Sequence, residues 1–420
     1  MTPKLRHRGL IGLGGRRRAE PPKPSPTATP VRRKPSVDFS LTGMLYASTM
    51  MFMGLAAVNS QANLLFGVFG LMLGVLAFSF LLGRVTLKRL EVTRSLPEVA
   101  IVGEPAMIQY QFQNKKRFWP SVAVSVAELE GSEAFTHQPQ AYMLHAGPGK
   151  TTVVPLEVVP KRRGLHKLSG YQLITSFPFG FLRRAWTGVE DDEILIYPAI
   201  GKVSPRLLAM CLAAEQGGAN IKPRRNGTDE FYGVKEFREG ENPRWIYWKR
   251  SARTGTLISK EMFHVSPPQL LIIVDTYLEQ DTQQQRIAVE KTLAMAATMA
   301  NTALESGLAV GMCGWADGWK TVPEQRGKRH CRDILAALAD LPLNRNTPPD
   351  WLLQRAAPLL KDGVTPVLFT PRNLNQSLGE LARGGMLTVC AESEQANAWF
   401  KFDPKIDFSR SMPASQESAS

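Results

Sequence analysis

The first clear pattern along the chain is a long hydrophobic stretch without charge. Residues 41–83 contain no charged side chain, and a single helix of that length would extend about 65 Å, roughly twice the apolar core of a bilayer. Polar residues at 59–63 divide the stretch, so we expect two spans at about 42–58 and 64–83 joined by a short turn. A cleavable signal peptide competes with this interpretation, but its positive region would have to be roughly forty residues long. The pattern therefore predicts a transmembrane helical hairpin.

Charge flanks this hairpin on both sides. Residues 1–40 carry ten Lys or Arg against two acidic residues, within a net charge of +14 for the whole chain. Since cytoplasmic flanks are enriched in positive charge, we expect both termini in the cytoplasm. The tail, residues 1–40, is expected to be disordered and attracted to anionic lipid headgroups. Because the excess charge lies mainly in this tail, we expect no specific binding of nucleic acid.

The next region, residues 84–200, has the pattern of short strands. Residues 108–112 alternate apolar and polar side chains, and the three Val of residues 122–127 share one face. Gly and Pro separate the runs, and no long helical pattern intervenes. The region is predicted to form a small antiparallel β-sandwich, similar in shape to an immunoglobulin domain.

From residue 201 to 408 the periodicity changes. Residues 270–274 are a continuous apolar run, which suits a strand buried on both faces, and residues 286–305 have a helical pattern. Strands and helices then alternate, so we expect an α/β domain with a mostly parallel sheet. The polar end, residues 409–420, is expected to be disordered. The whole chain is thus predicted to be an α+β multidomain protein.

The first strand of the α/β region ends in Asp275, and a long helix follows. This arrangement resembles a von Willebrand factor A domain, in which a D-x-S-x-S loop holds a divalent cation. Here Tyr277 and Glu279 replace both serines, and Arg372 would place positive charge near the cation. We therefore expect a von Willebrand A-like fold with a degenerate metal site. A metal-dependent adhesion or hydrolytic module that uses Asp275 and Glu279 is the alternative.

The sequence offers no catalytic constellation. Its four cysteines form no C-x-x-C pair, and His330 and Cys331 are neighbours whose side chains would diverge on a helix. The motifs G-x-S-x-G, H-E-x-x-H and Walker A do not occur. We expect no enzyme activity and no cofactor.

A short window, residues 231–263, is unusually rich in Trp and Arg. It contains Gly240-Glu241, Arg244, an aliphatic-x-Trp triplet ending in Trp248, and Ser251-Ala252-Arg253. This window resembles the signature of a bacterial family catalogued as domain of unknown function 58, often found beside MoxR-type AAA+ ATPases. The candidate site residues are Arg238, Glu241, Arg244, Trp248, Arg250 and Arg253.

Two main interpretations of the window remain open. In the first, Ile246 and Trp248 are buried, and Arg244 or Arg253 pairs with Glu241 in a buried clamp. In the second, the Trp and Arg residues form a partner-binding surface; binding to anionic lipid or nucleic acid is a third option. We expect Trp248 to be buried. We expect Arg250→Ala and Arg253→Ala to fold normally, because two cations so close together are not both buried with partners. The family resemblance implies a scaffold protein of the bacterial cytoplasmic membrane that works with an AAA+ ATPase.

Overall fold

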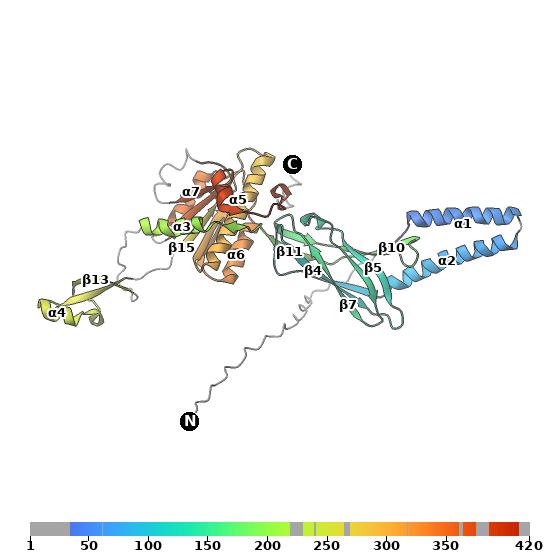
Figure 1. The fold of residues 1–420 in the computed structure, drawn as a ribbon, viewed down its shortest axis with the longest axis horizontal. Helices are drawn as coiled ribbons and strands as arrows, with labels where there is room; N and C mark the ends of the chain where they lie inside the picture. The colour runs from blue at the N-terminus through green and yellow to red at the C-terminus, as the bar shows by residue number, and fades with distance from the viewer. Residues whose placement is uncertain are drawn as a thin grey trace, which may run out of the picture.

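The computed structural model describes residues 34–60, 62–218, 230–238, 241–263, 269–316, 318–360, 364–374 and 386–410. It is an elongated, mixed α+β molecule with several sheets (Figure 1). A pair of apolar helices lies at one end, a β-rich domain follows, and an α/β domain lies beyond it. Residues 1–33 and 411–420, which make up most of the two segments where we expect disorder, lie outside the described residues. Residues 409 and 410 belong to a 3-10 turn, η5 (Phe408–Arg410), so the expectation is wrong for them.

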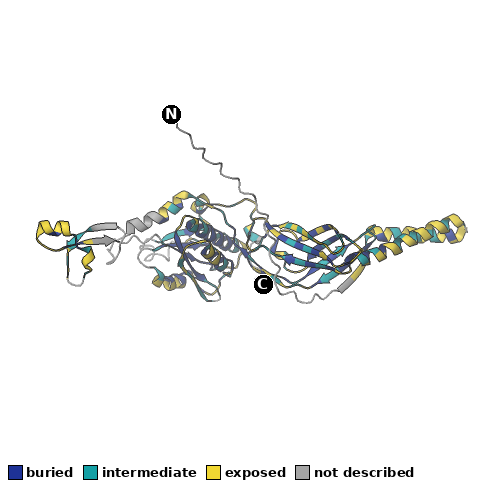
Figure 2. Ribbon diagram, turned by 90° about the horizontal axis from the view of Figure 1, so that it is seen from below, coloured by how far each residue is buried: buried dark blue, intermediate teal, exposed yellow. Residues whose placement is uncertain are grey.

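Two apolar helices form the hairpin, α1 (Leu41–Ser60) and α2 (Asn63–Leu87). Both are long and apolar enough to cross a membrane, as the uncharged stretch predicts. Most of their side chains are exposed, which suits contact with lipid (Figure 2). Helix α2 continues to Leu87, so the expected domain boundary at residue 84 falls inside the helix.

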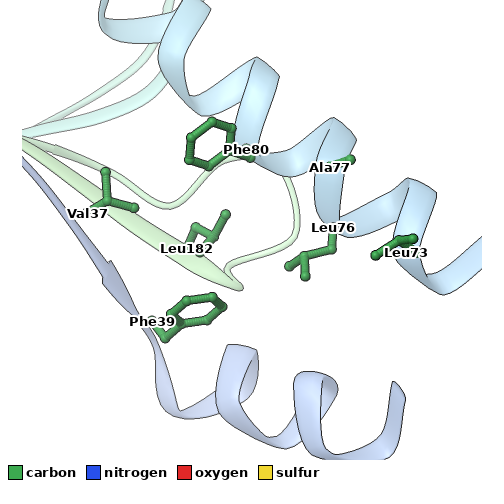
Figure 3. Close-up of a pocket in the computed structure, with 7 residues that line it drawn as sticks. All are labelled: Val37, Phe39, Leu73, Leu76, Ala77, Phe80 and Leu182. Atoms are coloured by element: carbon green, nitrogen blue, oxygen red, sulfur yellow. The ribbon is translucent and has the colours of Figure 1, made fainter. Parts of the chain in front are cut away.

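The segment just before the hairpin is ordered. Strand β1 (Lys34–Phe39) pairs antiparallel with β10 (Leu182–Gly188), and Val37 and Phe39 lie beside α2 (Figure 3). The expectation of disorder throughout residues 1–40 is therefore wrong for residues 34–40. Average composition favoured disorder, but the last six residues before Ser40 alternate apolar and polar positions and add a strand to an existing edge.

Mostly antiparallel strands build the β-rich domain at residues 90–197, which we call the sandwich. One sheet has the order β1-β10-β9-β5-β6, which adds β9 (Tyr171–Thr175), β5 (Ser121–Glu128) and β6 (Gln140–Ala146). A second sheet, of order β2-β4-β7, comprises β2 (Leu90–Ser95), β4 (Ala106–Asn114) and β7 (Thr151–Val158). A third, of order β3-β11-β8, comprises β3 (Ala100–Ile101), β11 (Asp192–Tyr197) and β8 (Gly164–Leu168), with β3 parallel to β11. Apolar side chains from all three sheets share one core.

A buried lysine joins the sandwich to the hairpin. The ammonium group of Lys116 donates hydrogen bonds to the carbonyl oxygens of Thr86 (2.7 Å) and Val85 (2.9 Å), in the last turn of α2. It also donates to the hydroxyl of Ser121 on β5, at 2.7 Å. Burial lowers the pKa of Lys116 to about 8. A cation at a helix C-terminus satisfies orphan carbonyl groups, so this contact anchors α2 on the sandwich.

The α/β domain is built on a five-stranded sheet of order β17-β16-β15-β18-β19. Its parallel strands are β15 (Gln269–Val274), β16 (Ala309–Trp315), β18 (Val364–Thr370) and β19 (Leu387–Cys390). Edge strand β17 (Trp319–Gln325) is antiparallel. The predicted mostly parallel sheet is therefore present.

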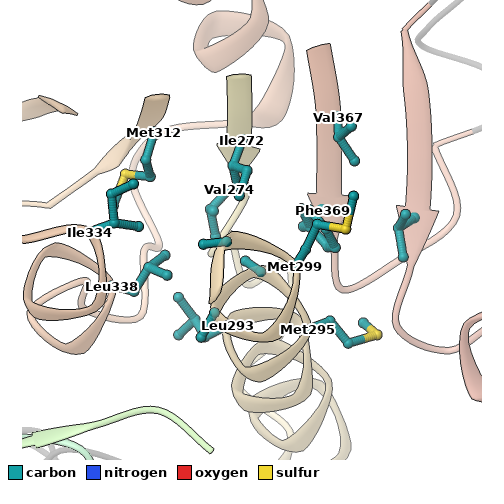
Figure 4. Close-up of a cluster of buried hydrophobic side chains, with 14 of the residues drawn as sticks. Ile272, Val274, Leu293, Met295, Met299, Met312, Ile334, Leu338, Val367 and Phe369 are labelled. Atoms are coloured by element: carbon teal, nitrogen blue, oxygen red, sulfur yellow. The ribbon is translucent and has the colours of Figure 1, made fainter. Parts of the chain in front are cut away.

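Helices cover both faces of this sheet. On one face, α5 (Gln283–Glu305) and α6 (Lys328–Ala339) pack against the sheet, where Leu293 and Met299 meet Ile272 and Val274 (Figure 4). On the other face, α7 (Pro349–Ala356) packs against Leu271 and Ile273. Four further elements lie outside this sheet: β12 (Lys202–Val203), α3 (Pro205–Gly218), α8 (Glu394–Trp399) and β20 (Phe400–Lys401), which pairs with β12.

Candidate partner-binding arm and sheet edge

The signature window forms a small unit between α3 and β15, which we call the arm (described residues 230–238 and 241–263). It consists of strand β13 (Glu230–Glu236), the 3-10 turn η2 (Pro243–Trp245), helix α4 (Trp248–Thr254) and strand β14 (Ile258–Phe263). The two strands pair antiparallel. In Figure 1 the arm lies at the end of the molecule opposite the hairpin.

A serine at the centre of the arm holds its elements together. The hydroxyl of Ser251 accepts a hydrogen bond from the backbone N–H of Ile258 at 2.9 Å, and donates to the carbonyl oxygen of Tyr247 at 3.1 Å. Ser251, Ile246 and Ile258 are buried, and together they form the small interior of the arm. Sequence reasoning missed this structural role of Ser251, although the Ser-Ala-Arg triplet was the signal for it.

The expectation that Trp248 is buried is wrong, since the residue is 66% exposed. The aliphatic-x-Trp alternation suggested a strand, in which Ile246 and Trp248 would share a face. The chain instead leaves the extended conformation at Tyr247, and Trp248 is the first residue of α4. Only Ile246 keeps the buried position that the alternation predicts.

The expected buried clamp on Glu241 is also absent from the described residues. The carboxylate of Glu241 pairs with the ammonium group of Lys235 at 2.9 Å, rather than with Arg244 or Arg253. Its hydrogen bond with Lys235 lowers the pKa of Glu241. Glu241 pairs with Lys235 because of the strand pairing. Lys235 on β13 lies opposite Ser259 on β14, and Ser259 also hydrogen-bonds Glu241.

The arm that carries the exposed tryptophan also carries several exposed cationic side chains. The exposed residues of the arm with a positive charge are Arg238, Arg244, Lys249, Arg250, Arg253 and Lys260. Arg250 and Arg253 are thus both exposed, which agrees with the expectation that they are not both buried with partners. Trp and Arg combine large apolar area with directional hydrogen bonds, and they are enriched at binding hot spots. The arrangement suits recognition of an acidic surface that offers an apolar pocket.

The second region of interest is the carboxyl edge of the parallel sheet. The Asp275 carboxylate is buried and accepts hydrogen bonds from the backbone N–H of Tyr277 (2.9 Å) and the hydroxyl of Thr370 (3.2 Å). Burial raises the pKa of Asp275 to about 6. Glu279 is turned toward Arg372, whose guanidinium donates to it at 2.9 Å. Among the residues that the structure describes, no group of three or more His, Cys, Asp or Glu side chains could hold a metal ion.

We do not expect Mg²⁺ to bind at this edge of the sheet. We expect no rise in the melting temperature of the full-length protein in detergent when millimolar Mg²⁺ is added, because Arg372 already pairs with Glu279. A site filled at a hundred times its dissociation constant would add about 2.7 kcal/mol to the free energy of unfolding. Arg372→Ala, which frees Glu279, is the comparison variant. A clear Mg²⁺-dependent rise in the parent protein would contradict the prediction.

Part of this chain matches a known protein family. The chain has two apolar helices, several sheets and an arm rich in Trp and Arg. Residues 233–361 match a family model described as "Protein of unknown function DUF58". This match includes most of the arm and continues through α7, and it confirms the resemblance seen in the signature window.

One relative adds to this finding. The chain is 20% identical over 191 residues to a protein of Bacillus subtilis (strain 168) described as "Uncharacterized protein YeaD". The alignment covers 45% of this chain and 46% of that relative, so the chain spans less than half of the length of the relative.

Proposed function

We propose that this protein is a membrane-attached scaffold whose arm binds the acidic surface of a partner protein. The observation that carries the proposal is the 66% exposure of Trp248 among exposed Arg and Lys side chains. An exposed tryptophan adds little to the stability of a core, whereas it can supply much of the affinity at an interface. The two apolar helices support attachment to the bacterial cytoplasmic membrane, with both termini in the cytoplasm.

The partner that we propose is an AAA+ ATPase of the MoxR type, as the family resemblance implies. The order of the parallel strands, with Asp275 at the carboxyl edge, supports a von Willebrand A-like fold for the α/β domain. Domains of that kind commonly act as adaptors beside such ATPases. The metal-dependent alternative receives less support, because Glu279 is paired with Arg372 and Asp275 is buried against Thr370.

The test is affinity capture with the full-length protein from detergent-solubilised membranes, with and without ATP. Trp248→Ala and Arg250→Ala are expected to reduce recovery of the AAA+ ATPase, by roughly tenfold or more if Trp248 is a hot spot worth about 2 kcal/mol. Both variants should unfold within about 1 kcal/mol of the parent protein, because both side chains are exposed.

Trp119→Ala is the matched control, since Trp119 is 59% exposed but lies in the sandwich. This control should recover the ATPase as the parent does. The proposal fails if Trp248→Ala captures the ATPase as well as Trp119→Ala, or if the parent captures no AAA+ ATPase in either nucleotide condition.

A further inference from the structure

An apolar groove lies where the hairpin meets the sandwich. It has a volume of about 350 Å³ and is open to the outside (Figure 3). Its lining comes from β1, β10 and α2: Val37, Phe39, Leu73, Leu76, Ala77, Phe80 and Leu182. The helix that forms one wall is one of the two that could cross a membrane, so the groove is continuous with the surface that lipid chains would cover.

An arginine stands at one end of this groove. Arg184 on β10 is directly opposite Val37 on β1, and so shares the groove-facing side of the two strands. Its guanidinium carbon lies 4.3 Å from the centroid of the Phe80 ring. The Arg184 side chain also lies against Gly83 of α2. If Gly83 had a Cβ atom, that atom would be only 3.2 Å from the Cδ of Arg184. Arg184 is therefore packed between the sandwich and α2.

The charge of Arg184 lacks a counter-ion in the part of the chain that the structure describes. Only 7% of the residue is exposed, and its buried Nε has no hydrogen-bond partner. A second cation is near, because Arg84 directly follows Gly83, the residue of α2 against which Arg184 packs. Burial lowers the pKa of Arg184, and the positive charge of Arg84 lowers it further. Buried charges are normally paired, and two neighbouring cations at the end of an apolar groove are complementary to an anion that carries an apolar chain.

We propose that this junction binds one anionic phospholipid from the bilayer, with an acyl chain in the groove and the phosphate at Arg184 and Arg84. A lipid satisfies both halves of the site at once, because its chain covers the apolar lining and its phosphate accepts hydrogen bonds from the guanidinium groups. Basic pockets next to transmembrane helices recognise lipid headgroups by the same chemistry. The site is remote from the arm and independent of the partner proposed above.

Native mass spectrometry of the full-length protein in detergent, titrated with phosphatidylglycerol, tests this proposal. Arg184→Gln is expected to weaken binding of the first lipid by about tenfold or more, because a desolvated charge-assisted contact is lost. Arg183→Gln is the matched control. Arg183 is the exposed neighbour on the opposite face of β10, so this variant should bind as the parent does.

A second variant tests the groove without changing its charge. Ala77 is exposed and lines the groove, so Ala77→Phe should leave the fold intact, fill the space and weaken lipid binding by a similar factor. Phosphatidylcholine should bind the parent more weakly than phosphatidylglycerol, and inorganic phosphate at the same concentrations should not displace the lipid. The proposal is overturned if Arg184→Gln binds like Arg183→Gln, if Ala77→Phe binds like the parent, if both lipids bind equally, or if phosphate alone displaces the lipid.

Discussion

Replacing Glu290 by Ala is expected to lower the free energy of unfolding by about 3–5 kcal/mol, because it leaves a buried guanidinium without its counter-ion. Glu290 lies in α5 of the α/β domain and is 3% exposed; it pairs with Arg163 of the sandwich, which is fully buried. Arg163 also donates a hydrogen bond to the carbonyl oxygen of Leu341 at 2.6 Å. Burial lowers the pKa of Arg163, but a guanidinium beside a carboxylate stays charged at neutral pH.

Thermal unfolding of the full-length protein in detergent measures this effect, and a fall in melting temperature of roughly 10 °C is expected for a domain of this size. Asp340→Ala is the matched control. It breaks the exposed pair between Asp340 and Lys320 and should cost no more than about 1 kcal/mol. A double variant, Arg163→Met with Glu290→Leu, should recover much of the loss, because no buried charge then remains unpaired. If Glu290→Ala melts like Asp340→Ala, the pair does not hold the two domains together.

This contact also matters for the proposed function. Ala294, one turn beyond Glu290 in α5, belongs to the apolar core of the sandwich, so the two domains share a packed boundary as well as an ion pair. Lys116 in turn fixes the sandwich to the end of α2. The connections run from the hairpin through the sandwich to the α/β domain that carries the arm. A scaffold that presents a partner away from the membrane needs such a continuous support.

Local hydrophobic patterns in the sequence correctly predicted single helices and strands. The uncharged stretch predicted the two apolar helices, and the continuous apolar run at residues 270–274 predicted a strand covered on both faces. The prediction failed at Trp248, because the turn at Tyr247 interrupts the alternation on which it rested. It also failed at residues 34–39, whose strand exists only because β10 supplies an edge.

The contacts that join distant parts of the chain could not be predicted from one sequence. Arg163 and Glu290 are 127 residues apart, and either could have been an ordinary surface charge. The role proposed for Arg184 in lipid binding depends on the strand pairing that places it opposite Val37 and next to α2. Charged residues in a β-rich region are usually exposed, so burial of this kind has no signature in composition or periodicity.

The second large effect is expected inside the sandwich, where Arg94→Met should lower the free energy of unfolding by about 3–5 kcal/mol near neutral pH. The buried guanidinium of Arg94 donates to Glu128 at 2.6 Å and to Asp192 at 2.9 Å. Glu128 also accepts a hydrogen bond from the hydroxyl of Tyr110 at 2.7 Å. The variant therefore leaves the buried carboxylate of Glu128 without the cation that pairs with it.

The decrease in the free energy of unfolding caused by Arg94→Met should be smaller at low pH than at high pH. Burial raises the pKa of Glu128 and Arg94 opposes that rise, so removing Arg94 raises the pKa further. A carboxyl group whose pKa is raised in the folded state stabilises the protein below its unfolded pKa, and this contribution is lost as the pH rises through the folded pKa. Arg94→Met should thus melt closer to the parent at pH 5 than at pH 8. An equal difference in melting temperature at the two pH values would show that Glu128 is not the group left unpaired.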